Sequence, residues 1–154
     1  MGREEQVADA ARALGLDIDV RTFPQGTRTA EDAAAAVGCN VAQIVKSLVF
    51  VVDDQPVIAL VGGADRLDER KLATAAGGTA ARRANADEVR AATGYAVGGV
   101  PPFGHATSLQ CFVDEALLAH DVVWAAAGTP THVFASEPHA LVAAADAKVV
   151  HIRA

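Results

Sequence analysis

The sequence of 154 residues lacks the residue patterns of the familiar metal-dependent and covalent hydrolases. Its five histidines show neither H-x-x-x-H nor H-E-x-x-H spacing, so we expect no metal site. There is no G-x-S-x-G elbow, no P-loop and no G-x-G-x-x-G fingerprint, and no serine has a base partner visible in the sequence. Classical covalent or metal-assisted hydrolysis therefore has no visible machinery here.

Cysteine, long apolar runs and positive charge are also scarce. Cys39 and Cys111 lie far apart and form no C-x-x-C pair, which fits a reducing cytoplasm. No run approaches the roughly 18 apolar residues of a membrane span, and the first residues show no secretory signal, so we expect a cytoplasmic protein without a membrane partner. A net charge of −6 argues against broad nucleic-acid binding but leaves room for a small basic site.

What is present predicts one domain, spanning residues 1–154, that can bury a core. Periodicity and capping signals predict helices over 3–14, 30–37, 68–76 and 85–93, and a last helix that begins near Pro138. Alternation and short apolar runs predict strands over 17–23, 43–52, 56–61, 79–83, 110–113, 122–126, 132–135 and 148–152. Because strands outnumber what βαβ alternation needs, we predict an α+β fold with a mixed, largely antiparallel, strongly curved sheet and peripheral helices.

The segment from Tyr95 to His105 combines three glycines with two adjacent prolines. Glycine permits close backbone approach, whereas proline fixes φ and removes a donor, so this segment is neither helix interior nor central strand. We expect a stiff loop in which the backbone N–H groups of Gly98, Gly99 and Val100 are free to point at a ligand. It is either a rigid connector or a loop that cradles a ligand.

Lys46 is the residue that does not fit its surroundings. It lies in the most apolar stretch, residues 43–52, whose two faces are both apolar if the stretch is a strand. A lysine in a central strand must extend to the end of the sheet, meet an anion or line a polar cleft. The sequence leaves these alternatives open, the last two of which would make Lys46 part of a functional site.

Two stretches together, 43–50 with its lysine and 93–104 with its glycines and prolines, closely resemble the YbaK/EbsC family. These proteins are free-standing relatives of the editing domain inserted in bacterial prolyl-tRNA synthetase. The resemblance covers nearly the whole chain in the same order. It implies a compact domain around a mixed, barrel-like sheet, and a hydrolase that removes a wrong amino acid from mischarged tRNA in trans, most often from proline tRNA.

Carried over by position, the resemblance implies roles for particular residues. Lys46 matches the family lysine needed for activity, and residues 98–102 match the loop whose backbone contacts the aminoacyl ester and the terminal adenosine. Gly98 and Gly99 would then serve catalysis through their backbone, and Pro101 and Pro102 would contact substrate. An aminoacyl ester is already activated, so water positioning and oxyanion stabilisation suffice, without metal or organic cofactor.

The amino-acid pocket is expected to be lined by Thr29, Ser47, Val100 and His132. The strand that contains His132 departs from the bacterial cysteine-tRNA deacylase pattern, which carries an aspartate nearby, and is similar to alanine-directed editing domains. His132 is otherwise an ordinary strand histidine. Because a small pocket separates residues that differ by a methylene or hydroxyl only about 10- to 200-fold, alanine, cysteine, serine and 2-aminobutyrate all stay open.

The expected partners are the 3′ aminoacyl-adenosine end of mischarged tRNA and prolyl-tRNA synthetase, with the oligomeric state left open. Five basic residues either form a modest tRNA-facing patch or are solvated surface: Arg66, Arg70, Lys71, Arg82 and Arg83. The alternative function is a non-catalytic module that binds aminoacyl-adenylate, adenosine or a synthetase. An intact Lys46 and glycine loop favour the enzyme.

Overall fold

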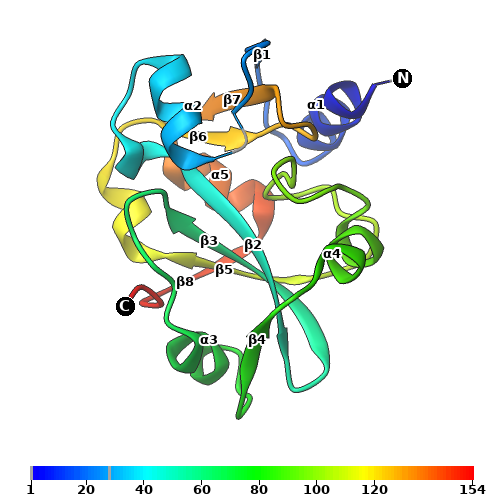
Figure 1. Cartoon of the computed structure of the whole chain (residues 1–154), viewed down its shortest axis with the longest axis vertical. Coiled ribbons are helices and arrows are strands. Elements are labelled where there is room, and N and C mark those ends of the chain that lie inside the picture. The colour runs from blue at the N-terminus through cyan, green and yellow to red at the C-terminus, as the bar shows by residue number, and fades with distance from the viewer. Residues whose placement is uncertain (1, 28) are drawn as a thin grey trace.

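The computed structural model describes residues 2–27 and 29–154. Its helices are α1 (Arg3–Ala13), α2 (Ala30–Val37), α3 (Glu69–Ala75), α4 (Ala86–Thr93) and α5 (Pro138–Ala145), with short 3-10 turns η1 (Val41–Gln43) and η2 (Glu115–Ala119). Its strands are β1 (Val20–Thr22), β2 (Val45–Val52), β3 (Gln55–Gly62), β4 (Ala81–Arg83), β5 (Gln110–Asp114), β6 (Val123–Ala126), β7 (His132–Ser136) and β8 (Ala147–Val150). Figure 1 shows their arrangement. None of the helices described is long and apolar enough to cross a membrane.

The strands form two sheets, of order β4-β2-β3-β5-β8 and β1-β7-β6. In Figure 1 the smaller sheet, with α1 and α2, lies above the larger one. The pairs β3–β5 and β5–β8 are parallel and the others antiparallel, which confirms the mixed α+β fold. An isolated parallel bridge between Ile44 and Trp124 joins the two sheets, but within the described residues the strands do not close into a barrel.

The β2–β3 hairpin is the centre of the fold. Its tip is Asp53 and Asp54, both at positive φ, and its register places Lys46 opposite Val61. Alternate residues of β2 enter different clusters: Val45 and Val49 pack in the larger core, whereas Phe50 packs in a second core on the other face. The strand is therefore central, as the apolar pattern predicts.

The helices near the site begin and end where the capping signals predict. The Thr29 hydroxyl accepts a hydrogen bond from the Asp32 N–H at 3.1 Å, and Gly38 ends α2 in the left-handed conformation. Asn85 and Glu88 form the expected capping box of α4. These local contacts set where α2 and α4 start relative to the central strands.

A buried carboxylate holds the C-terminal residues against the larger sheet. Asp114 is fully buried and accepts hydrogen bonds from the N–H groups of Ile152, at 2.9 Å, and Arg153, at 3.1 Å. The Arg153 guanidinium donates to the same carboxylate at 2.9 Å. Every contact is local to this end of the sheet, so Asp114 is a structural residue.

Candidate active site

A cavity of about 380 Å³ lies between α2, β2, β6 and the loop that follows α4. Its inner wall is apolar and buried, and includes Val45, Val49, Val89, Val100, Ala125 and Val133. Exposed residues border its mouth, among them Thr29, Glu31, Arg83 and Val97. The volume falls in the range of small-ligand sites, and the lining combines an apolar interior with charged groups at the entrance.

Lys46 lies in the wall of this cavity, half-buried, on the outgoing half of the β2–β3 hairpin. Its Nζ donates a short hydrogen bond to the backbone carbonyl of Asp65. Burial lowers the pKa of Lys46 from its usual value, and the charges of Asp65 and Glu31 partly oppose that effect. Since an ammonium has three N–H donors and Asp65 takes one, the others remain for a ligand.

The glycine loop faces the cavity with part of its backbone. Gly98 and Val100 line the cavity, and their N–H groups have no hydrogen-bond partner among the residues described. Gly98 has φ 92°, a conformation that glycine adopts without strain. Two residues of this loop thus line the cavity with N–H groups that have no partner in the described part of the chain.

Gly99 serves a different purpose from the one that its sequence context suggests. Its N–H donates to the Ala96 carbonyl at 3.0 Å, so that N–H is not available to a substrate. A Cβ at this position would lie 2.9 Å from both the Cα and the N of Thr129. Gly99 therefore allows the loop to pack closely against residues 128–129, whose Gly128 N–H donates to the Gly99 carbonyl at 2.9 Å.

Two hydroxyl groups expected in the pocket are found at the cavity. Thr29 borders the mouth, although its oxygen already caps α2. The Ser47 Oγ is buried and has no hydrogen-bond partner within the described part of the chain. A buried hydroxyl without a partner costs free energy, so the Ser47 hydroxyl is an unused donor and acceptor in a residue that lines the cavity.

Three other expected residues lie outside the cavity lining. Pro101 and Pro102 are buried residues of the loop, and the Pro101 carbonyl lies 2.7 Å from His105 Nε2. The His132 ring hydrogen bonds to Thr129 and lies 4.0 Å from a Glu4 carboxylate oxygen. Val133 lines the cavity whereas His132 does not, and the approach to Glu4 places the His132 ring beside α1.

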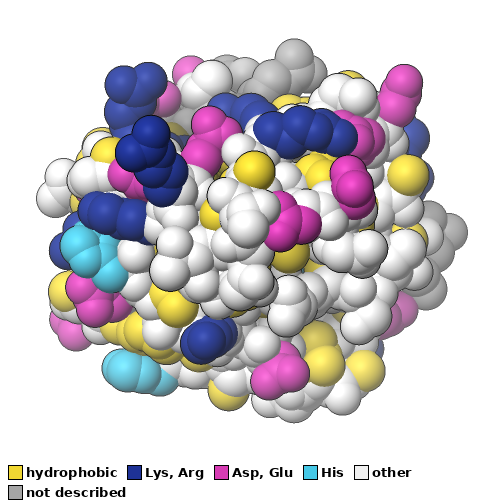
Figure 2. Space-filling model, turned by 90° about the horizontal axis from the view of Figure 1, so that it is seen from below, with side chains coloured by type: hydrophobic (Ala, Val, Ile, Leu, Met, Phe, Trp, Pro, Cys, Tyr) yellow, Lys and Arg dark blue, Asp and Glu magenta, His cyan; other side chains and the backbone are white. Residues whose placement is uncertain are grey.

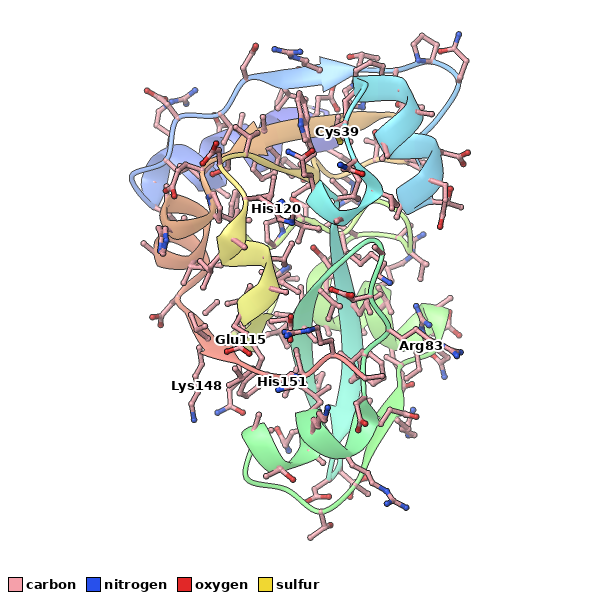
Figure 3. The ribbon with its side chains drawn as sticks, turned by 90° about the vertical axis from the view of Figure 1, so that its left-hand side faces the viewer. Cys39, Arg83, Glu115, His120, Lys148 and His151 are labelled. Carbon is pink, nitrogen blue, oxygen red and sulfur yellow. The ribbon has the colours of Figure 1, made fainter. Side chains whose placement is uncertain are left out.

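Several residues that line the cavity are not identifiable as site residues from the sequence, above all Glu31, Gly63 and Trp124. Gly63 follows the last residue of β3, and a Cβ there would lie 2.4 Å from the Val41 carbonyl and 2.8 Å from the Ala30 Cβ. Only glycine permits this approach of β3 to α2. Arg83, at the end of β4, borders the cavity and stands beside α4 in Figure 3.

Charges at the end of the molecule opposite the smaller sheet are mixed (Figure 1, Figure 2). Figure 2 views the end of the molecule that carries α3 and shows Lys and Arg interspersed with Asp and Glu. Arg82 is paired with Glu88 at 2.8 Å. The positive charge close to the cavity comes instead from Lys46, with Arg66 and Arg83 near enough to lower its pKa. The basic character of the site is therefore local.

The fold is that of the aminoacyl-tRNA editing domain. The family model described as the aminoacyl-tRNA editing domain matches residues 24–144, and the chain belongs to this family. Within it the chain is of the YbaK type, as the sequence resemblance predicts.

Individual relatives agree with this assignment. The chain is 33% identical to YwhH of Bacillus subtilis (strain 168) over 111 residues, which are 72% of this chain and 71% of YwhH. It is 36% identical over 109 residues to the proline–tRNA ligase of Geobacter sp. (strain M21), 70% of this chain but only 19% of the ligase. A crystal structure described as a candidate trans-editing enzyme for prolyl-tRNA synthetase superposes with a TM-score of 0.94 and 43% identity, over 100% of this chain and 98% of the other.

Proposed function

We propose that this protein is a trans-editing deacylase that hydrolyses the ester bond of mischarged tRNA carrying a small amino acid, alanine or cysteine on proline tRNA in the first instance. One observation carries the proposal: in a chain of the editing family, Lys46, Ser47, Gly98 and Val100 line one cavity, and the Ser47 hydroxyl and the N–H groups of Gly98 and Val100 have no partner among the described residues. Such a deacylase would support the fidelity of translation.

The reaction needs little from the protein. A water molecule attacks the carbonyl carbon of the aminoacyl ester, and the carbonyl oxygen becomes an oxyanion. The bond to the ribose oxygen then breaks, that oxygen takes a proton, and the products are the free amino acid and tRNA with a free terminal hydroxyl. The N–H groups of Gly98 and Val100 are suited to donate to the oxyanion, an interaction that strengthens as charge develops.

Lys46 is proposed to hold the substrate by its charge. Its side chain is fixed at one point by the Asp65 carbonyl, and its remaining N–H groups are free for the terminal phosphate, the adenosine end or the oxyanion. Burial lowers the pKa of Lys46, but Asp65 and Glu31 favour the charged form, so we assign it the role of a cationic donor and not that of a base.

The apolar interior is proposed to select the amino acid. Small side chains from the two sheets and α4, such as Val49, Val89 and Ala125, form a wall that suits a methyl or similarly small group. Ser47 contributes a polar group to this wall, one suited to contact a thiol, a hydroxyl or the ester. Because a pocket of this kind separates similar side chains by only about 10- to 200-fold, the amino acid must be determined by experiment.

The partners follow from the family, as proposals. The chain spans about a fifth of the length of the proline–tRNA ligase of Geobacter, so a free-standing copy could act on tRNA released by such an enzyme. The net charge of −6 suggests weak intrinsic affinity for tRNA, which a complex with the synthetase would supplement. The cytoplasm, where tRNA is charged, is the proposed compartment, and no metal or organic cofactor is invoked.

The test is hydrolysis of proline tRNA charged separately with alanine, cysteine, serine and proline, with catalytic amounts of protein in a buffer containing a chelator. We expect clearance of one noncognate ester and sparing of prolyl-tRNA. If neither these esters nor the same amino acids on other tRNAs are hydrolysed above background, the deacylase proposal is wrong. Binding of aminoacyl-adenosine without turnover would then favour a non-catalytic module.

A further inference from the structure

The mouth of the cavity carries a carboxylate that the reaction described above does not use. Glu31 lies in the first turn of α2 and borders the cavity, with its side chain exposed to solvent. Among the described residues that line the cavity it is the only one with a carboxylate. A charged group of the sign opposite to Lys46 and Arg83 is thus present at the entrance.

The carboxylate of Glu31 is not engaged by another residue of the described chain. No ion pair within 4.0 Å and no side-chain hydrogen bond involves it there, whereas Asp53, Glu88 and Asp114 all have such partners. It does lie close enough to Lys46 to raise the pKa of that ammonium. Glu31 and Lys46 therefore line the same cavity without forming an ion pair within 4.0 Å.

The substrate class of the proposed function has a group that suits this carboxylate. An aminoacyl ester carries its α-amino group on the carbon next to the reacting carbonyl, and near neutral pH a large share of such amines is protonated, with pKa values of about 7.7–8.0 in unperturbed α-amino groups. The same molecule carries a phosphodiester on the other side of the ester. One anionic and two cationic groups at the cavity match this arrangement of charges.

We propose that Glu31 binds the α-ammonium group of the aminoacyl moiety and so orients the ester carbonyl toward the N–H groups of Gly98 and Val100. The inference rests on the proposed deacylase function and deepens it. Because the ammonium nitrogen and the carbonyl carbon are bonded to the same Cα, anchoring one places the other. Glu31 then makes the site selective for esters with a free amino group over esters that lack the charge.

The surrounding structure holds Glu31 in place. The Thr29 cap fixes the start of α2, and Gly63 lets the end of β3 come within contact distance of Ala30, the neighbour of Glu31. Since β3 is paired in register with β2, the same contact relates α2 to Lys46. The carboxylate is thereby carried on a packed helix, which is the support that a substrate-binding group needs.

The test compares two nearly isosteric substrates, alanyl-tRNA and lactyl-tRNA, in which a hydroxyl replaces the ammonium. The quantity measured is the ratio of kcat/KM for the two esters in wild type and in Glu31→Gln, which keeps size and hydrogen bonding but removes the charge. Comparing the ratio between variants cancels the intrinsic difference in ester reactivity. We expect Glu31→Gln to lower the ratio about tenfold, mainly by slowing alanyl-tRNA, as for loss of a hydrogen bond to a charged group in a solvent-accessible site.

Asp32→Asn is the matched control, because Asp32 is the next acidic residue of the same helical turn and does not line the cavity. It should leave the ratio as in wild type. An active wild type whose ratio is the same in Glu31→Gln would overturn this inference while leaving the deacylase intact, and so would an equal loss in Asp32→Asn. A wild type that hydrolyses neither ester, even when the amino acid and its 2-hydroxy counterpart are varied, would instead refute the proposed function.

Discussion

Replacement of Lys46 by methionine should separate activity from stability. Methionine preserves the unbranched stem that packs along β2 but removes the ammonium. The lost hydrogen bond to the Asp65 carbonyl costs about 1.5–3 kcal/mol at most, as for bonds that involve a charged group. Burial of the ammonium has the opposite effect on stability. Because burial lowers the pKa of Lys46, folding disfavours the charged form of this side chain.

The lost hydrogen bond destabilises the variant, whereas removal of the buried charge stabilises it. Asp65 is also only partly buried, so water can hydrate its carbonyl in the variant. We therefore expect the free energy of unfolding to change by no more than about 1.5 kcal/mol, which corresponds to a shift in Tm of roughly 3–6 °C in a domain of this size. Urea unfolding followed by circular dichroism, with thermal scans, measures this directly.

Activity should respond far more strongly. If Lys46 touches the substrate as the charge of the ester develops, its loss should lower kcat/KM about 100- to 1000-fold, the range seen when one such donor is removed. Lys148→Met is the control, since Lys148 is an exposed lysine of β8 that does not line the cavity and lies apart from the cavity residue Arg83 in Figure 3. A folded Lys46→Met protein that retains activity within about tenfold of wild type would refute the assignment of Lys46 to the site.

Three further predictions rest on contacts around the site and core. Gly99→Ala should destabilise the fold by about 1–3 kcal/mol and reduce deacylation, because its Cβ would meet the Thr129 backbone at 2.9 Å; unchanged unfolding and activity would contradict this. Asp114→Asn should cost about 3 kcal/mol in urea unfolding at pH 7, through loss of the buried pair. Burial alone raises the pKa of Asp114, but its hydrogen bonds from Ile152, Arg153 and Ala116 outweigh this and lower it, so the cost should shrink as the pH falls below about 4; a cost that is independent of pH would contradict it. Arg83→Gln should reduce the slope of log(kcat/KM) against log[salt] by about 0.7, as for one lost phosphate contact, and an unchanged slope would place Arg83 outside the tRNA path.

Structural features that depend on residues close together in the chain could be predicted best from the sequence. The start and end of α2 follow from Thr29 and Gly38, and those of α4 from its capping box, because these caps act within one helical turn. The sequence does not predict that β5 pairs in parallel with β3 and β8, nor does it predict the turns η1 and η2. Strand partners and single turns depend on contacts between segments that are distant in the chain. β1 is shorter than its alternating pattern suggests.

The same distinction applies to the site. Lys46 could be identified because a charge in an apolar strand conflicts with its surroundings, whatever the fold. Glu31 gave no such signal, since an acid in the first turn of a helix satisfies local rules and its position at the cavity depends on the approach of α2 to Gly63. The hydrogen bond that occupies the Gly99 N–H, and the face on which His132 lies, likewise depend on tertiary structure.

The most direct test of the account is to map where the aminoacyl-adenosine end binds. A non-hydrolysable analogue, 3′-deoxyadenosine with alanine joined to a 3′-amino group, can be titrated into isotope-labelled protein while backbone amide shifts are followed by NMR. The account predicts saturable shifts centred on Gly98, Val100 and Ser47, which are absent in Lys46→Met. Shifts centred instead on the shallow surface between Arg70 and His151, or none at concentrations where mischarged tRNA is hydrolysed, would contradict it.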